Sequence, residues 1–152
     1  METIINPPRT YSEWVAVLDM LKERTNDEQV LRVMEQGTLE WQSGVAERFS
    51  RRLIETINFR MNRASDQFQK EMGRAMGQER VIVSALLALR RELSFLSKAI
   101  NIPVIPEKDR NKYCDLVINK ANKIQSSLED SAKSDRSGKL ASIVRNNRVN
   151  AF

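Results

Sequence analysis

The stretch that decides the fold is WQSGVAERFSRRLIETINFRMNRASDQFQKEMGRAM, residues 41–76. Its apolar side chains recur at steps of four residues, with a single step of three. They are Trp41, Val45, Phe49, Leu53, Ile57, Met61, Ala64, Phe68, Met72 and Met76. This spacing lines one face of an α-helix, whereas a strand requires a period of two. Because no proline interrupts the stretch, the sequence predicts one long helix.

The predicted long helix begins after Thr38, whose hydroxyl can cap its N-terminus, and runs to about Met76. Such a helix spans roughly 57 Å at about 1.5 Å per residue. Gly44 falls inside it, at a cost of about 1 kcal/mol relative to alanine. A step of four slightly exceeds one helical turn, so the apolar stripe drifts around the helix. We therefore expect this helix to contact different neighbours at its two ends.

Two shorter helices are predicted before this stretch. Residues 10–13, Thr-Tyr-Ser-Glu, form a capping box that opens a helix carrying Trp14. Residues 26–29, Asn-Asp-Glu-Gln, open a second helix that stops at Gly37. The very short turn between the two helices is typical of an αα-hairpin.

Two further helices are predicted after it. Residues 78–100 carry an apolar face of their own, and the glycines at 73 and 77 favour a chain reversal before it. After the extended residues 101–106, a last long helix begins near Pro106 and keeps its apolar period to about Leu128.

Together these elements predict an all-α fold, an up-down bundle of about four helices with one very long central helix and a basic C-terminal tail. Residues 1–9, with the pair Pro7-Pro8, are expected to form an extended N-terminal arm. Residues 10–132 form the helical bundle domain. Residues 133–152 form the basic tail, which we expect to be partly disordered or docked on another surface.

The tail accounts for most of the formal net charge of +5. Its basic residues are Lys133, Arg136, Lys139, Arg145 and Arg148, and its one acidic residue is Asp135. Apolar Leu140, Ile143 and Val144 lie between them. The pattern fits an arm that binds nucleic acid or an acidic partner, a peptide that closes its apolar side over its own bundle or a neighbouring subunit, or a frayed, solubilising end.

The residue types exclude several classes of enzyme. There is no histidine, and Cys114 is the single cysteine. Catalytic triads, histidine-ligated zinc and imidazole acid–base chemistry are therefore ruled out, as is a disulfide within the chain. No glycine-rich phosphate loop occurs. We predict no catalytic, metal-binding or cofactor-binding residue, and hence a protein that is not an enzyme.

The first functional hypothesis is a non-enzymatic helical scaffold or adaptor that acts through protein–protein contacts or self-association. Trp14 and Trp41 are candidate interface anchors, with core packing as the competing interpretation. Leu140, Ile143 and Val144 are further candidate anchors on the tail.

The alternative hypothesis is an accessory nucleic-acid-binding protein that makes sequence-independent phosphate contacts. Its candidate contacts, equally suited to an acidic partner, are Arg48, Arg52, Lys139, Arg145 and Arg148. On the long helix, the competing interpretation is an ordinary solvated face with intrahelical ion pairs.

No membrane partner is expected. The longest apolar stretch, residues 81–89, is too short to span a bilayer, and the first eight residues do not resemble a signal peptide. The expected location is therefore the cytoplasm, and the expected partner is another protein or a second copy of the chain, with nucleic acid as the alternative.

Overall fold

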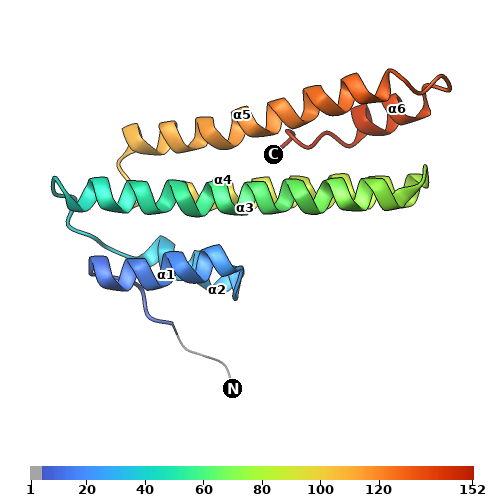
Figure 1. The fold of residues 1–152 in the computed structure, drawn as a ribbon. Helices are drawn as coiled ribbons and strands as arrows, with labels where there is room; N and C mark the ends of the chain where they lie inside the picture. The colour runs from blue at the N-terminus through green and yellow to red at the C-terminus, as the bar shows by residue number, and fades with distance from the viewer. Residues whose placement is uncertain (1–4) are drawn as a thin grey trace. The chain divides into compact units, whose positions relative to one another are not determined.

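The computed structural model describes residues 5–152, and in that part it contains helices and no strands, which confirms the all-α prediction. Six helices follow one another: α1 (Tyr11–Glu23), α2 (Asp27–Gln36), α3 (Val45–Ala75), α4 (Glu79–Ile100), α5 (Glu107–Ala132) and α6 (Lys139–Asn146) (Figure 1). Among these residues, no helix is both long and apolar enough to cross a membrane.

The chain divides into two compact units. Unit 1 comprises residues 1–60 and 98–113, and unit 2 comprises residues 61–97 and 114–152. The boundaries fall inside α3, α4 and α5, so each of these helices has a part in both units.

The helical hairpin of unit 1 follows its sequence signals. The Thr10 hydroxyl accepts a hydrogen bond from the Glu13 backbone N–H at 3.3 Å, as the capping box predicts. Arg24 and Asn26 have φ of 59° and 53°, so the turn between α1 and α2 uses two left-handed residues. Gly37 follows the last residue of α2, as predicted.

The N-terminal arm lies partly outside the described residues, which begin at Ile5. Residues 5–9 are not helical, and the Pro8 carbonyl accepts a hydrogen bond from the Thr38 N–H at 2.9 Å. This bond holds the described part of the arm against the segment that follows α2.

The predicted start of the long helix is wrong. Residues 37–42 are not helical, and α3 begins only at Val45. Gly44 has φ of 86°, a conformation that glycine adopts easily and that ends the possibility of a continuous helix from Thr38. The Trp41 ring packs edge-on against Phe49 with centroids 5.4 Å apart, so Trp41 joins the apolar stripe from outside the helix. The helix is consequently about 46 Å long.

The predicted reversal after the long helix occurs in unit 2. α3 ends at Ala75, and only three residues separate it from α4. Met76 and Gly77 have φ of 50° and 80°, so the connection is built from left-handed residues. Met76 is 89% exposed and therefore belongs to the turn, not to the apolar stripe.

The core of unit 1 is centred on Phe49. Trp14 packs edge-on against it with centroids 5.2 Å apart, and both side chains are fully buried. The buried residues of α1 and α2 that complete this core are Val17, Leu18, Leu21, Val30, Val33 and Met34. The amphipathic hairpin is therefore held on the first half of α3 by apolar burial.

The tail of unit 2 contains a helix. Residues 139–146 form α6, and Ile143, Val144 and Val149 are buried. Gly138 stands at the N-cap position with φ of 72° and has no side chain to cap the helix. The cap comes from Asp135, because one of its carboxylate oxygens accepts a hydrogen bond from the Leu140 N–H at 2.9 Å. Among the sequence-based alternatives, this arrangement corresponds to a tail that closes over its own bundle and not to a frayed end.

Candidate functional site

The two predicted phosphate contacts on α3 lie in unit 1 and already have neighbours. The Arg48 guanidinium lies 5.8 Å from the centroid of the Tyr11 ring, a cation–π arrangement. Arg52 pairs with Asp19 at 3.3 Å, and both side chains are largely exposed. An exposed pair of this kind stabilises a fold by less than about 1 kcal/mol, so another anion can replace Asp19 as the partner of Arg52 at little cost.

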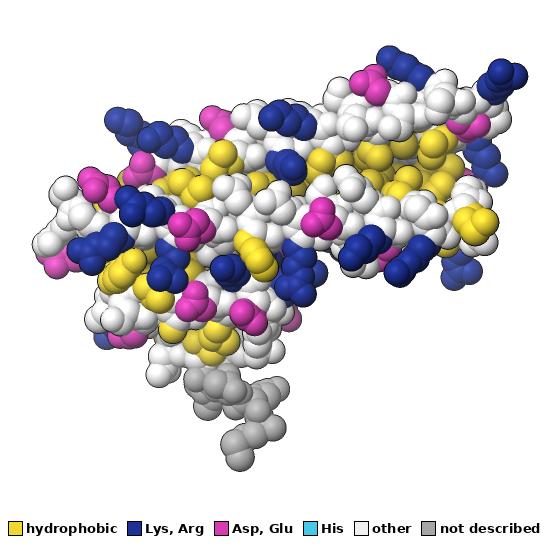
Figure 2. Space-filling model, viewed as in Figure 1, with side chains coloured by type: hydrophobic (Ala, Val, Ile, Leu, Met, Phe, Trp, Pro, Cys, Tyr) yellow, Lys and Arg dark blue, Asp and Glu magenta, His cyan; other side chains and the backbone are white. Residues whose placement is uncertain are grey.

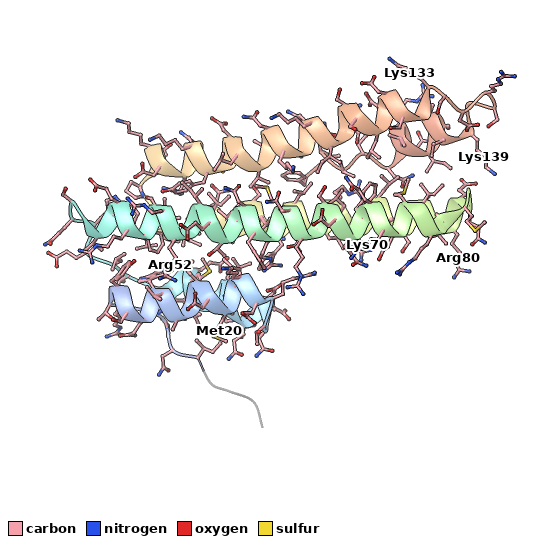
Figure 3. All side chains as sticks on the ribbon, in the orientation of Figure 1. Met20, Arg52, Lys70, Arg80, Lys133 and Lys139 are labelled. Atoms are coloured by element: carbon pink, nitrogen blue, oxygen red, sulfur yellow. The ribbon has the colours of Figure 1, made fainter. Side chains whose placement is uncertain are left out.

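The three predicted contacts in the tail lie in unit 2. Lys139 pairs with Glu79 at 3.7 Å, and Arg148 pairs with Glu129 at 4.0 Å. Arg145 is exposed and makes no ion pair among residues 5–152. Figure 3 shows Lys133 and Lys139 where α5 passes into α6. Two of the five predicted contacts therefore belong to unit 1 and three to unit 2.

The predicted interface anchors are largely buried. Trp14 has no exposed surface, and its indole N–H donates to the Thr38 carbonyl at 2.9 Å. Ile143 and Val144 are buried, while Trp41 and Leu140 are intermediate. Core packing thus describes Trp14, Ile143 and Val144, because these side chains are not accessible to a partner.

Arg60 has a structural role that its residue type alone does not indicate. Its side chain is fully buried and forms two 2.9 Å hydrogen bonds to the two carboxylate oxygens of Asp27. It also donates to the Leu21 carbonyl at 3.0 Å. One guanidinium therefore ties the end of α1 and the start of α2 to α3.

Gln125 has the corresponding role in unit 2. It is buried in α5, and its carbonyl oxygen accepts from the Val149 N–H at 3.0 Å. Its amide nitrogen donates to Glu129 at 3.1 Å and lies 3.5 Å from the Val144 carbonyl. This buried neutral side chain therefore helps to hold the tail on α5, in addition to the exposed Arg148–Glu129 ion pair.

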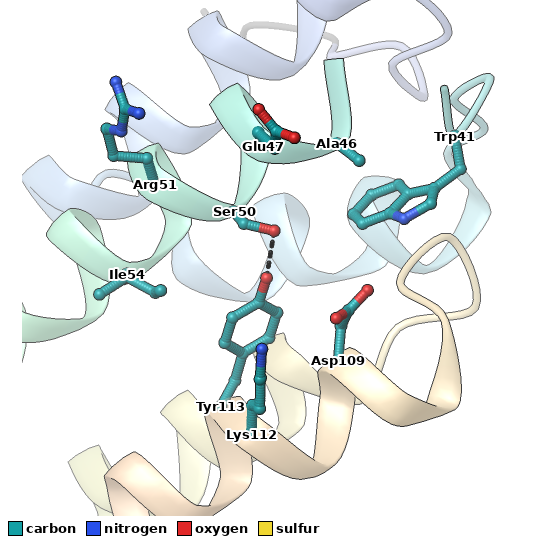
Figure 4. A pocket seen from close by; sticks show the side chains of 9 residues that line it. All are labelled: Trp41, Ala46, Glu47, Ser50, Arg51, Ile54, Asp109, Lys112 and Tyr113. Carbon is teal, nitrogen blue, oxygen red and sulfur yellow. Dashed lines mark hydrogen bonds between the residues drawn. The ribbon is translucent and has the colours of Figure 1, made fainter. Parts of the chain in front are cut away.

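A shallow pocket of about 450 Å³ lies in unit 1 between the start of α3 and the first turns of α5 (Figure 4). Its walls are Trp41, Ala46, Glu47, Ser50, Arg51, Ile54, Asp109, Lys112 and Tyr113. The Tyr113 hydroxyl donates to the Ser50 hydroxyl across the pocket. Burial raises the pKa of Tyr113, the Ser50 hydrogen bond opposes this, and nearby Asp109 raises it further. The phenol is therefore neutral at physiological pH, and the pocket has two acidic and two basic side chains.

A second cavity, which we call the unit 2 groove, encloses about 480 Å³ between α3 and α5. It is lined by Ser65, Phe68, Gln69 and Met72 of α3 and by Lys120, Lys123, Ile124, Ser127, Leu128 and Ser131 of α5. Figure 2 shows hydrophobic side chains gathered between these two helices. No sequence pattern had linked the two sets of residues, because they lie about 50 positions apart.

The net charge is unevenly divided. Unit 1 has 12 basic and 12 acidic residues, whereas unit 2 has 13 basic and 8 acidic residues. The entire excess of +5 therefore belongs to unit 2, which also contains the groove. Within residues 5–152, no group of three or more acidic, cysteine or histidine side chains is arranged to hold a metal ion.

Comparison of this chain with protein-family models, curated proteins and solved structures found no match.

Proposed function

We propose that the chain is a non-enzymatic helical scaffold or adaptor that acts through protein–protein contacts or self-association. The observation that supports this function is the unit 2 groove, whose apolar floor is open to solvent. Open apolar surface of this kind is typical of a docking site for a partner helix. The proposal includes an up-down arrangement of about four helices for the whole chain and a location in the cytoplasm.

Site-specific photo-crosslinking tests the proposal. Replacing Lys123 of the groove with a benzophenone amino acid should give a discrete covalent adduct with another protein, or with a second copy, in cells that express the chain. The matched control replaces Lys108, which is also exposed on α5 but lies in unit 1.

Light scattering across a dilution series should be run alongside, because it separates self-association from binding of another protein. Absence of adducts from both positions, together with a strict monomer at every concentration, contradicts the proposal.

A second candidate function is sequence-independent binding of nucleic acid. It is supported by the +5 charge of unit 2 and by Arg145, which has no ion-pair partner in the described part of the chain. Such binding weakens steeply with salt, since each neutralised phosphate releases counterions.

A salt titration with duplex and single-stranded DNA and RNA tests this function. Arg145→Gln should lower the affinity and reduce the salt slope by about one contact. Arg52→Gln in unit 1 removes the same charge and serves as the control. Binding that is insensitive to salt, or that Arg145→Gln leaves unchanged while Arg52→Gln weakens it, excludes unit 2 as the nucleic-acid surface.

A further inference from the structure

Along α5, the unit 2 groove is long enough to take a short helix. The residues of α5 that line it run from Lys120 to Ser131, which corresponds to about 16 Å along the helix axis. A partner helix of about three turns has the same length. It would present apolar residues at positions i, i+3 or i+4, and i+7, which is the pattern used when an amphipathic helix lies in a groove.

The floor of the groove is suited to such a pattern. Phe68 is buried at its base, and Met72, Ile124 and Leu128 are partly exposed beside it. Methionine is a flexible side chain that adapts to different apolar neighbours. Burial of these partly exposed apolar surfaces against a partner would favour binding.

The charge on the rim has one sign. Lys120 and Lys123 are the only charged side chains that line the groove, and neither makes an ion pair among residues 5–152. By contrast, Lys133, Lys139 and Arg148 of the same unit each have a carboxylate partner. A ligand that places carboxylates beside the two free ammonium groups would therefore meet no competing acid from the groove itself.

From these observations we propose that the unit 2 groove binds an acidic amphipathic helix of a partner protein, with carboxylates on the flank that faces Lys120 and Lys123. This inference rests on the proposed adaptor function and specifies its partner. A nucleic-acid backbone is a poorer occupant, because its phosphates would leave the apolar floor uncovered.

The test uses the full chain and three fluorescent peptides of about four turns each. The first carries leucine at i, i+3, i+4 and i+7 with glutamate on the flanks. The second carries lysine in place of each glutamate, and the third is a scrambled form of the first. Fluorescence anisotropy should show binding of the glutamate peptide at least tenfold tighter than binding of the other two.

Charge exchange then locates the site. The double variant Lys120→Glu/Lys123→Glu should weaken binding of the glutamate peptide at least tenfold and strengthen binding of the lysine peptide. The matched control, Lys108→Glu/Lys112→Glu, makes the same charge change at exposed positions of α5 in unit 1 and should have little effect. Circular dichroism should confirm that both variants keep the helical content of the wild type.

Three results would overturn the inference: equal affinity for the two charged peptides, equal effects of the two double variants, or a dimer that Lys120→Glu/Lys123→Glu dissociates. The last result would identify the groove as a contact between two copies of the chain. Adducts at position 123 that persist after any of these results would preserve the adaptor function and reject only the acidic helix as its partner.

Discussion

Units 1 and 2 each hold a peripheral helical segment with one buried polar side chain, but the two side chains differ in charge. In unit 1, the Arg60 guanidinium is neutralised by Asp27, whereas in unit 2 the neutral amide of Gln125 bonds to the backbone of the tail. A buried ion pair requires both partners, because either charge left alone is poorly solvated. An amide requires only that its donors and acceptors be satisfied.

The same difference extends to the surfaces. Unit 1 balances its 12 basic residues with 12 acidic ones, while unit 2 keeps five unbalanced positive charges. Unit 2 therefore has positive charge beyond what its own carboxylates can balance, and this excess is available to a partner. Substitutions that affect one unit and not the other can break or sharpen this comparison.

The largest effect is expected for Arg60→Met in unit 1. The substitution keeps an unbranched side chain of similar length but leaves Asp27, whose side chain is 29% exposed, without its partner. We expect a loss of about 3 kcal/mol in the free energy of unfolding, measured by urea denaturation with circular dichroism. Arg52→Met, which breaks the exposed pair with Asp19, should cost less than about 1 kcal/mol. Equal losses for the two variants would show that the buried pair has no special role.

The next largest change in stability is expected for a glycine-to-alanine substitution in unit 1, which has a matched substitution in unit 2. A Cβ atom at Gly37 in unit 1 would lie 2.5 Å from a ring carbon of Trp14 and 3.0 Å from the Pro8 carbonyl oxygen. Because Trp14 is fully buried, Gly37→Ala should cost about 2 kcal/mol by overpacking. Gly73, in the part of α3 that belongs to unit 2, has no such neighbour within 4 Å, so Gly73→Ala should stabilise the helix by about 0.5–1 kcal/mol. Thermal unfolding of the two variants should shift in opposite directions.

A smaller effect is expected for Gln125→Leu in unit 2. The substitution removes the acceptor of the Val149 N–H, at a cost of about 1–2 kcal/mol. Hydrogen exchange should accelerate at Val149 while the amides of α1 keep their protection. Asn122→Ala, which removes only the exposed hydrogen bond to Asn150, should leave the Val149 exchange rate nearly unchanged. Similar rates in both variants would reject Gln125 as the residue that holds the tail.

The smallest effect is a pH dependence confined to the cap of α6. Hydrogen bonds from the Leu140 N–H and the Ser137 hydroxyl lower the pKa of Asp135 below its ordinary value. The stabilisation is therefore fully present above the unfolded-state pKa and is lost as pH falls through the lowered folded-state pKa. NMR shifts of the Leu140 amide should follow this acidic transition in the wild type and not in Asp135→Asn, while amides of unit 1 should not report it.

The helical periods were well predicted from the sequence, but the start of α3 was not. The step from Trp41 to Val45 equals one helical interval, so the period alone extends the helix too far. The positive φ of Gly44 prevents the helix from extending back to Trp41. A glycine in the sequence does not by itself predict this break, because helix interiors tolerate glycine at a modest cost. Local capping, as at Thr10, was predictable because both partners lie three residues apart.

The burial of Arg60 and Gln125 could be predicted in part from their positions in the sequence. Arg60 lies three positions after Ile57 and four before Ala64, and Gln125 lies four positions after Ala121, so both occur on the apolar faces of their helices. Spacing alone can therefore mark them as buried, but it cannot identify Asp27, 33 residues away, or Val149, 24 residues away, as their partners. The unit 2 groove escaped prediction for the same reason, since its two sides come from distant helices.

The packing of Trp14 and Trp41 against Phe49 has an optical consequence. Both tryptophans of the chain belong to unit 1, and unit 2 contains none. Intrinsic tryptophan fluorescence therefore reports the melting of unit 1 alone, whereas far-ultraviolet circular dichroism reports the helices of both units. Coincident transitions in the two signals would mean that the continuous helices α3, α4 and α5 couple the units into one cooperative system, and separated transitions would give each unit its own melting temperature.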